Sequence, residues 1–72
     1  MEKKIIEFVK ANINMEDVNY TYSKMCVNRT SLHYQNPYLY NKINDLVEEF
    51  CIDNDIDNEY FDIEEIFDKI MD

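Results

Sequence analysis

The amino-acid sequence predicts a mainly α protein: a small bundle of three to four helices in a single domain, residues 1–72. Apolar residues recur at intervals of three and four in the stretches 2–13, 36–52 and 62–71, as they do on the buried face of a helix. Hydrophobic residues make up 46% of the chain and aromatic residues 14%, which is enough for a packed core despite a net charge of -9. No repeat or linker-like segment divides the chain.

The first helix is expected over residues 2–13. Its charged residues fall away from a single apolar stripe that consists of Ile5, Ile6, Val9 and Ile13.

The second of these helices, residues 36–52, has the strongest local signals. Asn36 is a favourable N-cap, and Pro37 follows at the first helical position, where its missing N–H costs nothing. The helical spacing is continued by apolar residues: Leu39, Ile43, Leu46, Val47 and Phe50. The last helix, residues 62–71, begins with a pair typical of a capping box, Asp62 and Glu65. Its apolar face is predicted to consist of Ile63, Ile66, Phe67, Ile70 and Met71.

The middle of the chain, residues 18–35, is compatible with two structures. Asn14 followed by Glu16 and Asp17 can begin a helix on which Val18, Tyr22 and Met25 share a face. The alternative is an α+β fold with a short hairpin within 18–35, because β-branched and aromatic residues alternate here and the chain could turn near Asn28. Helix is the favoured interpretation.

Charge is distributed very unevenly along the chain. Residues 1–42 carry six basic and four acidic residues, whereas residues 43–72 carry twelve acidic residues and a single lysine. Several acids occupy the C-terminal half of the predicted helix 36–52, where the helix dipole disfavours negative charge. Such a violation of a local rule is typical of a functional surface.

The first functional hypothesis follows from this asymmetry. An acidic face within residues 43–65 is expected to imitate the phosphates of a nucleic acid and to occupy a basic nucleic-acid-binding surface on a target protein, such as a host defence or transcription enzyme. This is the strategy of phage inhibitors of restriction, CRISPR and transcription machinery. The composition also suits a phage or mobile element, because Asn, Ile, Lys and Tyr account for 30 of 72 residues. The predicted partner-binding residues are Glu48, Glu49, Asp53, Asp55, Asp57, Glu59, Tyr38 and Tyr40.

Tyrosines support an interaction surface because their large rings carry a polar tip and are enriched at interfaces. Tyr38 and Tyr40 cannot lie on the same face of one helix, so at least one of them is expected to be exposed.

A second hypothesis is a small DNA-binding regulator. The segment "CVNRTSL", residues 26–32, resembles the turn and the early recognition helix of helix-turn-helix proteins. This resemblance implies DNA contacts by Arg29, Ser31, His33 and Tyr34. Gln35 and Pro37 would shorten such a recognition helix, and the net charge of -9 disfavours direct binding to nucleic acid.

A third hypothesis is calcium binding, because residues 53–64 resemble an EF-hand loop. Acidic residues stand at loop positions that supply oxygen ligands: Asp53, Asp55, Asp57, Glu59 and Glu64. Asn58 replaces the glycine of the usual sharp turn, and Phe61 replaces a residue that coordinates through water. The first hypothesis requires no cofactor; this one requires calcium.

Catalysis has little support in the sequence. His33 is the single histidine, and a chain without glycine has no glycine-rich phosphate loop. Cys26 and Cys51 are interpreted as small buried hydrophobic residues in a reducing compartment. No signal peptide or apolar membrane span is recognisable, so we expect a cytoplasmic protein without a membrane partner. A homodimer is compatible with the small size of the domain.

Overall fold

The computed structural model describes residues 2–57 and 61–72. The described residues form five helices and no strand, so the predicted mainly α fold is confirmed and the hairpin alternative within 18–35 is wrong. The helices are α1 (Glu2–Ala11), α2 (Met15–Asn28), α3 (Leu32–Gln35), α4 (Pro37–Asp53) and α5 (Ile63–Met71).

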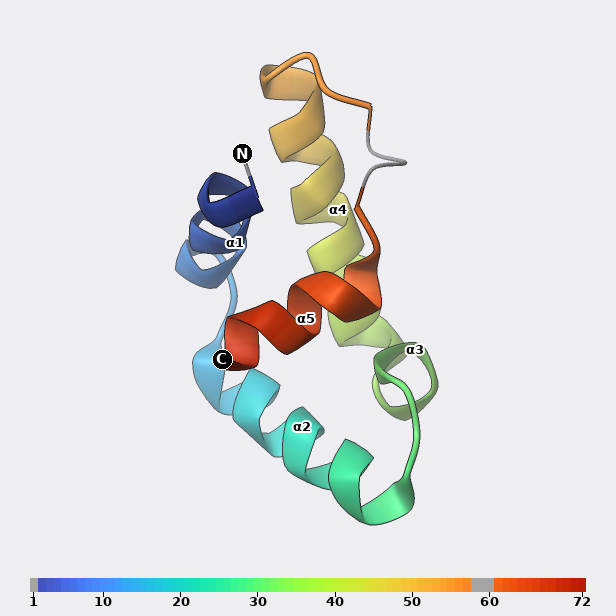
Figure 1. Ribbon diagram of the computed structural model, residues 1–72. Coiled ribbons are helices and arrows are strands. Elements are labelled where there is room, and N and C mark those ends of the chain that lie inside the picture. The colour runs from blue at the N-terminus through green and yellow to red at the C-terminus, as the bar shows by residue number, and fades with distance from the viewer. Residues whose placement is uncertain (1, 58–60) are drawn as a thin grey trace.

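The longest helix, α4, organises the domain (Figure 1). Helix α1 packs beside α4, α5 crosses both of them, and α3 packs against the N-terminal half of α4 and against α5. Helix α2 lies at one end of the molecule, next to α3 in the sequence and in space. Every helix contributes to one core: Ile5, Val9, Val18, Leu32, Leu39, Ile43, Leu46, Val47, Phe50, Cys51, Ile63, Ile66, Phe67 and Ile70.

Asparagine and aspartate side chains begin three of the helices. The side chain of Asn14 accepts the N–H of Glu16, that of Asn36 accepts the N–H of Leu39, and that of Asp62 accepts the N–H of Glu64. Each bond satisfies one of the N–H groups that the first turn of a helix leaves unpaired. These caps explain why the sequence places the starts of α2, α4 and α5 correctly.

This segment forms the helix α2 and not a hairpin, because the residues that start a helix at its N-terminus outweigh the strand propensity of its tyrosines. Its buried residues are Val18 and Thr21, and the other residues that alternate in the sequence, Tyr20 and Tyr22, are exposed. Thr21 accepts a hydrogen bond from the side chain of Asn36 at 3.0 Å, which ties α2 to the start of α4. Burial along one helical stripe therefore decides the conformation of this segment.

Two turns use a residue other than glycine in the left-handed region. Arg29 ends α2 with φ 55° and ψ 46°, and Asp55 follows α4 with φ 54°. In both turns a backbone N–H reaches back five residues, from Thr30 to the carbonyl of Met25 and from Ile56 to that of Cys51. These are Schellman-type helix ends, which usually contain glycine, and this chain has none.

No helix in the described part of the chain combines the length and the hydropathy that a membrane crossing requires.

Candidate acidic interaction surface

One face of α4 remains uncovered while the opposite face forms the core. At about 100° per residue, the exposed positions of α4 that follow Pro37 occupy an arc of about 140° centred near Asp45. We call this arc the α4 outer face; it consists of Tyr38, Asn41, Lys42, Asp45, Glu48, Glu49, Ile52 and Asp53, all of them exposed. The packing of α1, α3 and α5 on the other side of α4 leaves this face to solvent.

The outer face combines carboxylates with two large apolar side chains. Tyr38 is 88% exposed near the first turn of α4 and Ile52 is 79% exposed near its last turn. Asp45, Glu48 and Glu49 lie between them, so the apolar residues stand at the two ends of an acidic stretch. Both side chains are free to contact a partner, as four other large hydrophobic residues exposed elsewhere in the described part of the chain are.

The chain continues the acidic surface beyond α4. Asp53 is the last residue of the helix, and the left-handed backbone of Asp55 turns the chain so that Ile56 packs against the core. The carboxylates of Asp55 and Asp57 are exposed in this turn. Because the carbonyl end of a helix carries partial negative charge, the dipole of α4 adds to the negative potential of these residues.

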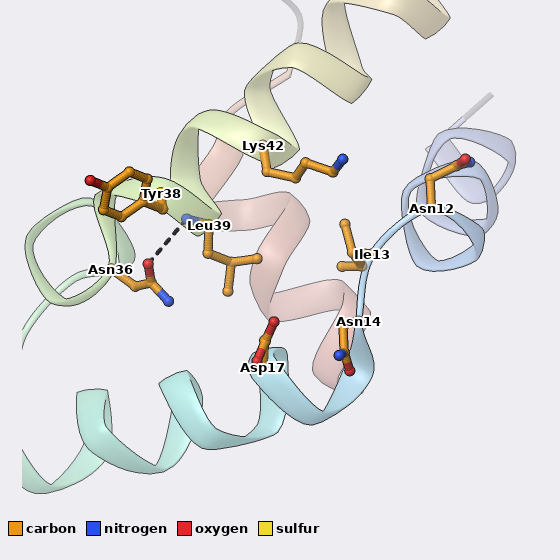
Figure 2. A pocket seen from close by; sticks show the side chains of 8 residues that line it. All are labelled: Asn12, Ile13, Asn14, Asp17, Asn36, Tyr38, Leu39 and Lys42. Carbon is orange, nitrogen blue, oxygen red and sulfur yellow. Dashed lines mark hydrogen bonds between the residues drawn. The ribbon is translucent and has the colours of Figure 1, made fainter.

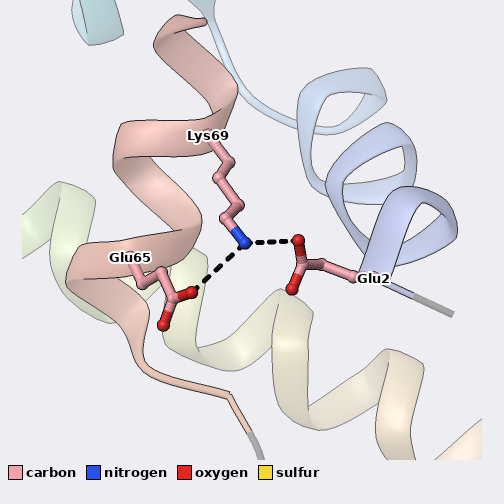
Figure 3. Close-up of polar contacts among 3 residues, drawn as sticks. All are labelled: Glu2, Glu65 and Lys69. Atoms are coloured by element: carbon pink, nitrogen blue, oxygen red, sulfur yellow. Dashed lines mark hydrogen bonds and ion pairs between the residues drawn. The ribbon is translucent and has the colours of Figure 1, made fainter.

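Lys42 is the basic residue of this outer face, and the ion pairs of the described residues lie elsewhere. The carboxylates of Asp45, Glu48, Glu49, Asp53 and Asp55 have no ion-pair partner within the described residues. Lys69, the lysine of the acidic half, is engaged elsewhere: it pairs with Glu2 of α1 and, at 3.2 Å, with Glu65 (Figure 3). The hydrogen bonds that the Lys69 ammonium donates to Glu2 and Glu65 raise the pKa of Lys69 above its ordinary value. Unpaired carboxylates retain their full attraction for a basic partner.

A hollow of about 460 Å³ lies beside the N-terminal end of the outer face (Figure 2). The α1–α2 connection, the first turn of α2 and the start of α4 form its wall. Its apolar lining is Ile13 and Leu39, with the Tyr38 ring at its edge, and Asp17 and Lys42 place opposite charges in it. It is therefore nearly neutral and partly apolar.

A second hollow, of about 390 Å³, lies beside the C-terminal end of the outer face. Cys51, Ile52 and Ile56 supply an apolar lining, and Glu48 and Asp57 supply carboxylates. Cys51 is only 2% exposed; burial, and then the charge of Asp57, raise the pKa of its thiol. The thiol therefore contributes an apolar surface here and is a poor nucleophile.

The predicted partner-binding residues divide into three groups in the structure. Those on or next to the outer face are Tyr38, Glu48, Glu49, Asp53, Asp55 and Asp57. Tyr40 lies apart from them, half-buried against the core with its ring 4.8 Å from that of His33. Glu59 lies outside the described residues.

Sequence analysis missed Ile52 as a candidate contact residue. The signal was present, because Ile52 falls off the stripe formed by Val47 and Phe50, and an isoleucine off the buried stripe of an amphipathic helix faces solvent.

The residues of the helix-turn-helix hypothesis lie around α3, which has only four residues. Arg29 is the left-handed residue that ends α2, and Ser31 precedes α3. His33 contacts Tyr40, whereas Tyr34 is 81% exposed. A helix of one turn is shorter than the recognition helices that lie in a DNA major groove. The positions of Gln35 and Pro37 in the sequence indicate this short length.

The residues of the calcium hypothesis do not converge within the described part of the chain. No group of three or more acidic, histidine or cysteine side chains is placed there to hold a metal ion. Asp53 belongs to α4, and the two oxygens of Glu64 accept the backbone N–H groups of Leu32 and His33 at 2.9 and 3.1 Å. Glu59 again lies outside the described residues. In this structure Glu64 is thus a helix cap for α3.

The two cysteines differ in exposure. Cys51 is buried, as predicted, but Cys26 is exposed on α2, which corrects the interpretation of both as buried. The stripe of α2 that reaches the core passes through Val18 and Thr21 and leaves Cys26 outside.

Comparisons of the chain with models of protein families, with curated proteins and with solved structures found no match.

Proposed function

We propose that this protein is a small acidic inhibitor or regulator that binds another protein. In this proposal the α4 outer face and the turn that follows it occupy a basic surface with which the target binds nucleic acid. The observation that carries the proposal is the row of exposed carboxylates on one face of α4, which have no ion-pair partner among residues 2–57 and 61–72. No chemical step is involved.

The density of charge supports mimicry of a nucleic-acid strand. The four carboxylates from Asp45 to Asp53 span eight residues of helix, which is about 12 Å at a rise of 1.5 Å per residue. Their average spacing along the helix axis is about 4 Å, close to the roughly 3.4 Å of axis per phosphate in one strand of B-DNA. A groove whose lysines and arginines match a phosphate backbone can therefore match this helix face.

The apolar residues of the outer face contribute binding free energy in addition to that of the charges. Opposite charges mainly accelerate association and select the partner, whereas buried aromatic and aliphatic side chains dominate the stability of most interfaces. Tyr38 and Ile52 can be covered by a partner without any change in the core, because neither belongs to it. An acidic centre with apolar ends thus favours a protein partner.

The proposal is tested by capture from a lysate of the host cells with the tagged protein, after nuclease treatment and with elution in rising salt. A basic nucleic-acid-binding protein should be retained and released by salt, since screening weakens contacts between exposed charges. A variant that removes four charges, E48Q, E49Q, D53N and D55N, should lose most of this retention.

The matched control removes four exposed carboxylates from other parts of the chain: E7Q, E16Q, D68N and D72N. Both variants have the same net charge, so a general effect of charge would weaken capture equally in the two. Equal loss in both variants, or no loss in the first, would contradict the assignment of binding to α4.

A further inference from the structure

The hollow beside the start of α4 is formed by two segments that are far apart in the sequence (Figure 2). Residues 12–17 supply one wall and residues 36–42 supply the other. Its volume of about 460 Å³ lies within the range of about 300–1,000 Å³ that is typical of small-molecule sites. Part of the lining is apolar, because Leu39 is only 8% exposed and Ile13 is half-buried against the core. The hollow therefore has room for a small molecule with an apolar part.

Asparagine side chains hold both walls in place. Asn12 donates to the carbonyl of Phe8 at 2.8 Å, at the end of α1, and Asn14 caps α2. Asn36 caps α4 and donates to Thr21 at 3.0 Å. These bonds shape the hollow without a ligand, so little ordering has to accompany binding. Two amide atoms have no partner among the described residues and remain available to a ligand: Oδ1 of Asn12, an acceptor, and Nδ2 of Asn14, a donor.

Opposite charges line this hollow without pairing with each other. Asp17 comes from the first turn of α2, and Lys42 comes from α4. Neither side chain has an ion pair or a hydrogen bond within residues 2–57 and 61–72. Figure 2 shows them on different walls, and in this view the Leu39 side chain lies between them. Each charge is therefore available to a ligand group of the opposite sign, and apolar surface separates the two.

We propose that this hollow binds a small zwitterion of the amino-acid class. The Asp17 carboxylate accepts hydrogen bonds from the ligand's ammonium group, and the Lys42 ammonium donates to the ligand's carboxylate. The aliphatic carbons of the ligand cover Ile13 and Leu39. A ligand with a single charge leaves one of the two charged side chains without a partner, so it uses only half of the site. This site lies outside the carboxylates that carry the proposed function, and the inference does not rest on that function.

The test is an NMR titration of the isotope-labelled full chain at low salt, where screening of exposed charges is weakest. Norleucine is compared with hexanoate, which lacks its ammonium group, and with pentylamine, which lacks its carboxylate. Norleucine is expected to bind at millimolar concentrations and about fivefold more tightly than either analogue, because each analogue loses one charge-assisted hydrogen bond. The isomer ε-aminocaproate, whose charged groups are farther apart, is the second zwitterionic probe.

Two substitutions assign each charge to its ligand group. In D17N the advantage of the ammonium group should disappear, so that norleucine binds no more tightly than hexanoate. In K42M norleucine should bind no more tightly than pentylamine. Because ligands are compared on the same variant, a change in the stability of the fold does not alter the result. The controls D68N and K4M remove exposed charges outside the hollow and should keep the preference for the zwitterion.

The position of the ligand is read from the side-chain NH₂ signals of Asn12 and Asn14, which should shift on binding. The proposal is overturned if neither zwitterion binds, if the single-charge analogues bind as tightly as norleucine, or if the preference for the zwitterion survives both D17N and K42M. Shifts confined to residues outside the hollow would overturn the assignment of the site. None of these outcomes bears on the proposed function, whose carboxylates remain unchanged in every variant used.

Discussion

The carboxylate of Glu64 on α5 accepts the backbone N–H of Leu32, the first residue of α3, at 2.9 Å. Its second oxygen accepts the N–H of His33 at 3.1 Å. Ser31, the residue in the N-cap position of α3, makes no side-chain capping bond, so Glu64, which lies 32 positions after Leu32, supplies the cap. This contact joins α3 to α5 and holds the segment that leads into α4.

Replacement of Glu64 by glutamine should destabilise the fold. The amide offers one oxygen and turns an NH₂ group toward the second backbone N–H, so one charge-assisted hydrogen bond is lost. We expect a loss of about 1 kcal/mol in the free energy of unfolding, measured by chemical denaturation. The control is E65Q, which removes only an exposed ion pair and should change stability by less than about 0.5 kcal/mol. If E64Q and E65Q changed the free energy of unfolding equally, the cap of α3 would contribute nothing to stability.

Glycine at position 29 should stabilise the protein. Arg29 has φ 55°, where a side chain with a Cβ costs about 1–2 kcal/mol and glycine costs nothing except the greater entropy of the unfolded chain. R29G is expected to raise the free energy of unfolding by about 0.5–1 kcal/mol. The control S23G, at an exposed position inside α2, should lower it by about 0.5 kcal/mol. If R29G and S23G both lowered the free energy of unfolding, the left-handed conformation at residue 29 would be contradicted.

The contribution of Lys69 to stability should disappear at alkaline pH. The hydrogen bonds that Lys69 donates to Glu2 and Glu65 raise its pKa in the folded state. The stabilisation is therefore fully present below the ordinary lysine pKa of about 10.4 and is lost as the pH rises through the folded value. K69M should therefore melt at a lower temperature than the parent protein at pH 7, and the two melting temperatures should converge as the pH rises past the raised pKa of Lys69. If the difference in melting temperature persisted at high pH, the effect of K69M would come from packing and not from the charge of Lys69.

The two thiols should react at very different rates with a disulfide reagent. Cys26 is exposed, whereas Cys51 is buried and its thiol pKa is raised by burial and by Asp57. At pH 8 one equivalent should react at once and the second only on unfolding, since the thiolate is the reactive form. C26S should abolish the fast phase, and C51S should leave it intact. Two fast equivalents in the native protein would contradict the placement of Cys51 in the core.

The features that sequence analysis predicted correctly depend on near neighbours. Asn36 and Pro37 determine the start of α4 within one turn, and the stripe of apolar residues determines which side of the helix is buried. The same logic favours helix for α2, where Asn14 caps the first turn. The expectation that at least one of Tyr38 and Tyr40 is exposed is confirmed by Tyr38, whereas Tyr40, predicted as a contact residue, packs against the core.

The features that were missed depend on distant contacts. Nothing near Leu32 in the sequence indicates that Glu64 caps α3, so by their spacing alone the acids of residues 53–64 resemble a calcium loop. The two hollows are likewise formed by segments that only the fold brings together, such as Asp17 and Lys42. The spacing of carboxylates in an acidic segment does not show which of their oxygens accept hydrogen bonds from the backbone of the same protein.

The central claim, that the acidic face of α4 occupies a nucleic-acid-binding surface, is tested most directly by displacement. A fluorescent nucleic acid bound to the captured target is titrated with the parent protein, with the E48Q, E49Q, D53N, D55N variant, and with the E7Q, E16Q, D68N, D72N control. The account predicts that the parent and the control release the nucleic acid and that the α4 variant does not. Release by all three proteins, or a target that binds the parent protein and nucleic acid at the same time, would contradict it.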